Sequence, residues 1–152
     1  MRTLWSLAVR FPKAFRSYLR LASSDSVPDV SAVEKRLLRM SSWVAKADRR
    51  LLGTANLRNC LARAMVESRR QGGLANRQEA VELINSWSFQ IKQITFEKIF
   101  LWHGERDRVM PVEPARCLAQ ELPRCSATFY PNEGHFSVLM NQAEHIFRAL
   151  SP

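Results

Sequence analysis

The sequence predicts an α/β protein in which a helix-rich first part is followed by two short parallel strands with flanking helices. Residues 1–86 carry apolar residues at helical spacing and contain no strand pattern. Two short apolar runs follow, at residues 99–102 and 126–130. Between these runs, residues 114–122 have helical spacing, and a helical connection is typical of two parallel strands.

Composition and charge divide the chain into two regions. The 152 residues are 46% hydrophobic, which fits a single globular domain with its own core. Residues 1–92 contain 17 Lys and Arg against 7 Asp and Glu, a net charge of +10, whereas residues 93–152 contain 6 against 7, a net charge of −1. We therefore expect a basic helical region before a near-neutral α/β region.

The cysteines predict neither a disulfide framework nor a metal site. Cys60, Cys117 and Cys125 are odd in number and have no C-x-x-C or metal-ligand spacing. We interpret them as thiols in a reducing compartment, and we expect a cytoplasmic protein without metal or other cofactor. No apolar run reaches the ~18–20 residues that a membrane span needs, so no transmembrane segment is predicted.

Residues 2–22 form the first amphipathic pattern, with one apolar face and five basic residues. The interpretation we favour is a helix with a solvated basic face, broken or kinked at Pro12. A transit peptide or a helix on a membrane surface stays open as an alternative.

Further helices are predicted up to residue 86. Ser31 and Glu34 fit a capping box that starts a helix running to about residue 47. Asp48 is expected to cap a short turn that ends at Gly53. Helical spacing then continues from residue 57 to 68, and another helix is expected from residue 76 to about 85.

The second region is predicted to contain both strands. Residues 99–102 are apolar on both faces and are followed by Gly104, as expected for a buried parallel strand. Residues 126–130 alternate more clearly, and residues 138–150 predict a closing helix.

Asp107 and His135 each follow the end of one predicted strand. The carboxyl ends of adjacent parallel strands meet at one edge of a sheet, where open α/β sheets place their functional loops. We therefore expect the carboxylate and the imidazole within hydrogen-bonding range. In such a pair the carboxylate fixes the imidazole tautomer, and the other ring nitrogen serves as a general base.

Residues 98–150 resemble the C-terminal third of α/β-hydrolases of the group that includes esterases, lipases, lactonases and epoxide hydrolases. The resemblance is carried by F-L-W-H-G-E-R-D-R-V-M-P at residues 100–111 and N-E-G-H-F at residues 132–136. It implies that Asp107 is the acid and His135 the base of a catalytic triad. It also implies a helical cap at residues 1–86, a core segment at residues 87–152, and a small apolar ester-like substrate.

The sequence departs from this resemblance in its missing nucleophile. The 152 residues contain no G-x-S-x-G elbow, and neither Ser6 nor Ser137 has a strand–turn–helix setting that replaces it. The nucleophile therefore stays open between Ser, Asp and Cys. We expect a partial chain with little hydrolysis on its own, because a base alone lacks the main sources of acceleration. An exposed sheet edge predicts self-association.

A non-catalytic role is the alternative. The charge of +10 on residues 1–92 fits a basic helical module that binds an acidic partner or an anionic membrane surface. Specific nucleic-acid recognition is not expected, because no basic motif with interleaved aromatic residues accompanies the arginines.

Overall fold

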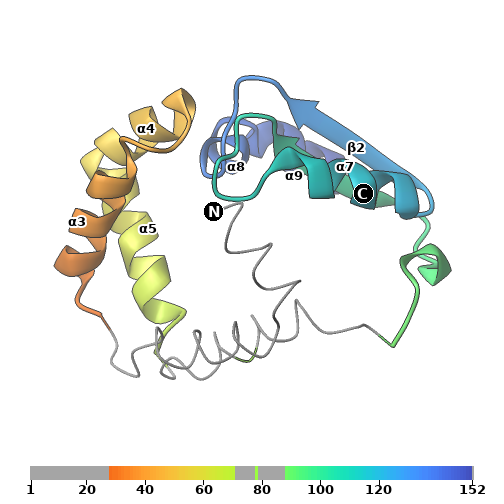
Figure 1. The fold of residues 1–152 in the computed structure, drawn as a ribbon, viewed down its shortest axis with the longest axis horizontal. Coiled ribbons are helices and arrows are strands. Elements are labelled where there is room, and N and C mark those ends of the chain that lie inside the picture. The colour runs from red at the N-terminus through yellow and green to blue at the C-terminus, as the bar shows by residue number, and fades with distance from the viewer. Residues whose placement is uncertain (1–27, 71–77, 79–87, 152) are drawn as a thin grey trace. The chain divides into compact units, whose positions relative to one another are not determined.

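The computed structural model describes residues 28–70, 78 and 88–151 (Figure 1). Two compact units are distinguished. The first comprises Met1–Arg36 and Asn59–Ser88, and the second comprises Leu37–Arg58 and Phe89–Pro152. The helix predicted at residues 2–22 lies outside the described residues, as does nearly all of the one predicted at 76–85. The domain boundary expected after residue 86 also falls outside them and stays a prediction.

Helix α3 (Val30–Met40) begins with a cap that differs from the predicted one. The carboxylate of Asp29 accepts a hydrogen bond from the Ser31 amide at 3.1 Å and another from the Ser31 hydroxyl. Ser31 lies inside the helix, and its predicted role as the cap is wrong, because the carboxylate of Asp29, two residues earlier, is the stronger acceptor. The helix ends at Met40 rather than at about residue 47. Directly after this end, Ser41 Oγ donates to the carbonyl of Leu38.

Helix α4 (Lys46–Gly53) belongs to the second unit, and helix α5 (Ala55–Glu67) follows it. The turn before α4 is held by the guanidinium of Arg49, whose Nε donates to the carbonyl of Ser41 at 2.9 Å. Val44, Ala45 and Leu52 are all buried. Helix α4 contacts α8 (Ser137–Asn141), which belongs to the same unit.

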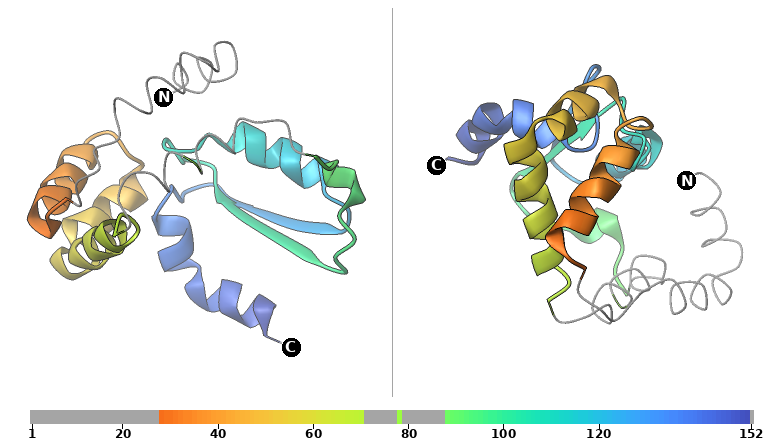
Figure 2. Two further views of the ribbon diagram at one scale, coloured as in Figure 1. Left: turned by 90° about the horizontal axis from the view of Figure 1, so that it is seen from below. Right: turned by 90° about the vertical axis from the view of Figure 1, so that its left-hand side faces the viewer.

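Strands β1 (Ile99–Gly104) and β2 (Cys125–Tyr130) pair in parallel, in a register that aligns Gly104 with Tyr130. Helix α7 (Val112–Glu121) connects them and lies along one side of the pair, while the C-terminal helices lie on the other (Figure 2). The α/β class and the two parallel strands are thereby confirmed. No third strand in the described residues pairs with either one, so each strand has an unpaired edge.

The end of the chain forms two helices rather than the single helix predicted at residues 138–150. Helix α8 (Ser137–Asn141) and helix α9 (Ala143–Leu150) are separated at Gln142, whose φ of −108° and ψ of 10° leave the helical region. Asn141 Nδ2 donates to the Glu133 carboxylate at 3.0 Å, which ties this break to the residues after β2. None of the helices in the described part is long and apolar enough to cross a membrane.

Candidate active site

Asp107 is held by a tight turn directly after β1. Its amide donates to the carbonyl of Gly104 at 3.1 Å, and its Oδ1 accepts from the amides of Val109 and Met110 at 2.7 and 2.8 Å. These bonds fix the side chain by local geometry, as is typical of aspartate in turns. Oδ2 is left to face the end of β2.

His135 lies in the histidine loop, which we define as residues 131–137, from the end of β2 to the first residue of α8. Its Nδ1 lies 2.8 Å from Oδ2 of Asp107. A carboxylate only accepts, so Nδ1 carries the proton and Nε2 is the nitrogen left for a reacting group. No described residue is hydrogen-bonded to Nε2. The structure thus brings together the two residues that the sequence singled out.

The close approach of β1 to the histidine loop explains the glycine at the end of β1. A Cβ on Gly104 would lie 2.5 Å from the carbonyl oxygen of Glu133, which is closer than real Cβ atoms come. The loop is also bonded to the turn after β1, where the Arg106 amide donates to the Glu133 carbonyl at 2.9 Å. Glycine therefore lets the two loops that carry Asp107 and His135 lie against each other.

The electrostatics of the pair favour a charged carboxylate beside a proton-binding imidazole. Burial by itself raises the pKa of Asp107, whose side chain is 5% exposed, but the hydrogen bond from His135 and the amides of Met110 and Val109 outweigh it. The pKa of Asp107 is therefore lowered from 3.8. The hydrogen bond to Asp107 raises the pKa of His135 above 6.5 against the opposing effect of burial, and the charges of Asp107 and Asp48 add to the increase.

A cleft of about 430 Å³ opens beside the pair. Asp107 and His135 line it together with mostly apolar residues of β1, α7 and α8. The apolar members include Trp102, Met110, Pro114, Leu118 and Val138. Such a lining with a few convergent polar groups is typical of small-molecule sites.

Three polar residues close to the pair in the sequence have other partners. Nδ1 of His103 lies 2.9 Å from the carbonyl of Gly104, to which it donates. Glu105 pairs with Arg116, and Glu133 accepts from Asn141. In the described residues no group of three His, Cys, Asp or Glu side chains is arranged to hold a metal ion.

The sequence singles out Asp48 for a local role, but its partners in the structure are distant. It lies in the first turn of α4, whose N-cap residue is Ala45 and has no side-chain cap, so the predicted capping role of Asp48 is wrong. Its carboxylate instead accepts from the amides of His135, Phe136 and Ser137 at 2.9, 3.0 and 2.8 Å. One signal was available: Asp48 follows Ala45 by three residues and precedes Leu52 by four, which places it on the buried face of an amphipathic helix.

Comparison with known proteins agrees with this architecture. A crystal structure of a mutant meta-cleavage product hydrolase (CumD) matches 83% of the chain with a TM-score of 0.51 and 21% sequence identity. The described fold is part of an α/β-hydrolase fold. The match covers 45% of the hydrolase chain, so this chain spans about half of its length. No protein-family profile and no curated protein matches the sequence.

Proposed function

We propose that the chain supplies the acid and the base of a hydrolytic triad, and that the nucleophile comes from polypeptide outside these 152 residues. The observation that carries this proposal is the 2.8 Å contact between Asp107 Oδ2 and His135 Nδ1, with Nε2 left without a described partner beside an apolar cleft. Asp107 holds the imidazole in one tautomer and stabilises its protonated form. Nε2 then takes a proton from the nucleophile or from water and returns it to the leaving group.

The lining of the cleft supports the proposal of a small ester-like substrate with an apolar group. Its walls are formed mainly by apolar side chains, among them Trp102, Leu118 and Val138. An ester-like small molecule with an apolar group fits such a lining, because burial of its apolar surface favours binding. Ester, lactone and epoxide hydrolysis all use the same acid–base pair, and the nucleophile decides among them.

Unpaired strand edges and exposed apolar side chains support completion of the fold by further polypeptide. Phe96 is 72% exposed, and on α9 Phe147 is 65% and Leu150 58% exposed. Large apolar side chains in such numbers are typical of an interface. We propose that they pack against a nucleophile-bearing segment. Without that segment, we expect the chain to associate with itself through the same surfaces.

Translation of the DNA directly upstream of the Met1 codon tests the proposal first, because a G-x-S-x-G or G-x-D-x-G sequence there would supply the nucleophile. The joined polypeptide is then assayed with p-nitrophenyl butyrate. We expect Asp107→Asn and His135→Ala each to lower kcat/KM by at least about a hundredfold. His145→Ala, which changes an exposed histidine of α9, is the control and should retain the rate.

Two results would contradict the proposal. Unchanged kcat/KM in both variants of the joined polypeptide would exclude Asp107 and His135 from the chemistry. Hydrolysis by the 152-residue chain alone, abolished by His135→Ala, would show that the nucleophile is already present.

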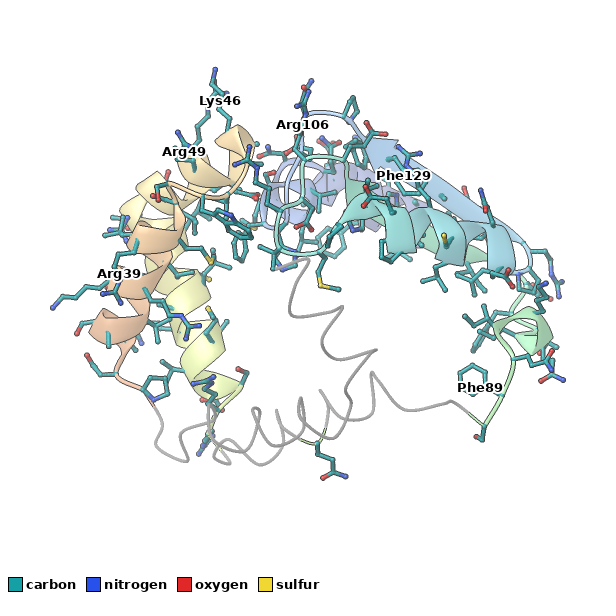
Figure 3. All side chains as sticks on the ribbon, in the orientation of Figure 1. Arg39, Lys46, Arg49, Phe89, Arg106 and Phe129 are labelled. Carbon is teal, nitrogen blue, oxygen red and sulfur yellow. The ribbon has the colours of Figure 1, made fainter. Side chains whose placement is uncertain are left out.

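A basic pocket favours a second candidate function, binding of an anionic surface. Lys46 and Arg50 of α4 line a pocket of about 580 Å³ together with Arg106 and Arg108. In the described residues none of these four side chains forms an ion pair, and the only acidic residue in the lining, Glu133, accepts from Asn141. Lys46 and Arg106 extend to the same side of the second unit (Figure 3). We propose that this pocket binds anionic headgroups.

Vesicles of phosphatidylcholine with and without phosphatidylserine test this second candidate. Lys46→Gln with Arg50→Gln should weaken binding to the anionic vesicles by about fivefold for each charge removed. Lys35→Gln with Arg36→Gln removes the same charge from exposed positions of α3 and should weaken it less. Equal losses in both double variants, or no binding to either vesicle, would contradict the pocket as the binding site.

A further inference from the structure

The carboxylate of Asp48 binds the backbone of the histidine loop rather than any side chain. Its Oδ2 accepts from the His135 amide at 2.9 Å, and its Oδ1 accepts from the amides of Phe136 and Ser137 at 3.0 and 2.8 Å. Asp48 is fully buried, with 0% exposure. No ion pair joins it to a lysine or arginine of the described residues. Three consecutive amides therefore satisfy the buried charge.

The remaining amide of this segment has a separate acceptor. The Gly134 amide donates to Oγ of Ser137 at 2.7 Å, and Ser137 is also completely buried. All four amides from residue 134 to 137 are thus hydrogen-bonded, three of them to Asp48. The backbone that carries the His135 side chain is fixed from both sides, because Arg106 binds the carbonyl of Glu133 through its amide at 2.9 Å.

Hydrogen bonds connect the turn after β1, the histidine loop and α4 with the turn before it, each to the other two. Asp107 bonds the side chain of His135, and Asp48 bonds its amide. The guanidinium of Arg108 completes the set, since its Nη1 donates to the carbonyl of Trp43 in the turn before α4 at 2.9 Å. A shift of α4 would therefore move both partners of the acid–base pair.

We propose that Asp48 is a positioning residue for His135, which fixes the backbone of residues 135–137 so that Nδ1 faces Asp107 and which places a second negative charge beside the imidazole. The proposal rests on the role of His135 as the base. A buried carboxylate is costly, and a neutral acceptor would satisfy backbone amides with less desolvation. The negative charge of Asp48 also favours the protonated form of the imidazole.

The charged groups that face His135 come from two elements. Asp107 approaches from the turn after β1, and Asp48 approaches from α4. Both negative charges raise the pKa of His135, after the larger effect of the hydrogen bond to Asp107. The ring of Phe136 adds an edge contact with centroids 5.0 Å apart and carries no charge.

Asp48→Asn is the informative substitution, because it keeps the shape of the side chain and removes its charge. The amide oxygen can still accept from Phe136 and Ser137. The amide NH₂ group then faces the backbone N–H of His135, and two donors cannot bond to each other. The substitution therefore breaks the bond to His135 selectively.

NMR of the 152-residue chain provides a readout that needs no substrate and no nucleophile. The chain has three histidines, so the ring signals of His135 can be assigned by single substitutions. In Asp48→Asn we expect the titration midpoint of the His135 ring to fall and its backbone amide to exchange at least about tenfold faster. Asp29→Asn, which alters an exposed carboxylate that also binds a backbone amide, should change neither.

The wild-type chain gives a second measurement that holds even where Asp48→Asn does not fold. The Asp48 ¹³Cγ signal should shift as the His135 ring titrates, because each charge senses the other. An unchanged His135 midpoint in folded Asp48→Asn, or a flat Asp48 signal through the His135 titration, would overturn the proposal. A joined polypeptide that does not hydrolyse the ester would contradict the proposed function. That result would not change the NMR signals of His135 and Asp48, which test the positioning role alone.

Discussion

A Cβ on Gly134 would lie 2.1 Å from Oδ2 of Asp48. The carboxylate therefore occupies the space that any other side chain at position 134 would need. Gly134 and Asp48 are far apart in the sequence, but the presence of the aspartate requires a glycine at position 134. The same Cβ would also lie 2.8 Å from the Cβ of Ala45, so moving the Asp48 side chain alone would not make room for it.

Gly134→Ala should accordingly destabilise the chain by at least about 1–3 kcal/mol, because Asp48 has to leave the amides that it binds. Urea unfolding followed by circular dichroism measures this change. Gly53→Ala is the matched control, since its Cβ would meet nothing within 4 Å and alanine is the better helix former. A loss in Gly134→Ala no larger than that in Gly53→Ala would contradict the close contact.

The pH dependence of stability follows from the opposite pKa shifts of Asp107 and His135. The pKa of His135 is raised, so its contribution is fully present below about 6.5 and is lost as the pH rises through the pKa of the folded state. The pKa of Asp107 is lowered, so its contribution is present above about 3.8 and is lost as the pH falls through the folded value.

Urea midpoints of the wild type and of His135→Asn, measured across this pH range, test that dependence. The difference between the two proteins should be largest between the two unfolded-state values and should shrink toward both ends. His145→Asn, at an exposed position of α9, should follow the wild type throughout. A difference that grows toward alkaline pH would have the wrong sign.

Ser137→Ala should cost about 1–3 kcal/mol, because it leaves the buried Gly134 amide without an acceptor. Ser151→Ala removes an exposed hydroxyl that donates to the Phe147 carbonyl at 3.0 Å, and should cost no more than about 0.5 kcal/mol. Thermal unfolding of both variants gives the comparison. Equal losses would show that the hydroxyl of Ser137 does not hold the loop.

Self-association of the isolated chain should depend on the exposed apolar side of α9. Phe147→Glu removes a large apolar side chain that is 65% exposed, and we expect it to lower the sedimentation-average mass. His145→Glu adds the same charge to the same helix without removing apolar surface. If both variants dissociate equally, charge repulsion and not the loss of apolar contact is the cause.

Local signals made much of the architecture predictable. β1 was found because a short apolar run ends at a glycine, and Asp107 and His135 were placed together because each follows a strand of the same parallel pair. The break in the last helix was not found, because Gln142 is a favourable helix residue and the bond of Asn141 to Glu133 has no local trace. The sequence did not decide the cap of α3, because Asp29 and Ser31 both have side chains that can cap a helix.

Asp48 was misread for a different reason. An aspartate near a helix start normally caps that helix, and its actual partners lie 87 to 89 residues further along the chain. Only its position among Val44, Ala45 and Leu52 indicated a buried face, and a buried charge demands a distant partner. A position on that buried face predicts a contact with a distant part of the chain, but it does not predict that the partner is the histidine loop.

The bond between Asp48 and the histidine loop also determines where this chain can be recombined with a relative of the same fold. A crossover at any point between α4 and the histidine loop would join an aspartate from one parent to a glycine, a histidine and a serine from the other. Replacement of both segments of the first unit, Met1–Arg36 and Asn59–Ser88, keeps the two sides of this bond from one parent. In such an exchange α4 is inherited together with the histidine loop that it holds.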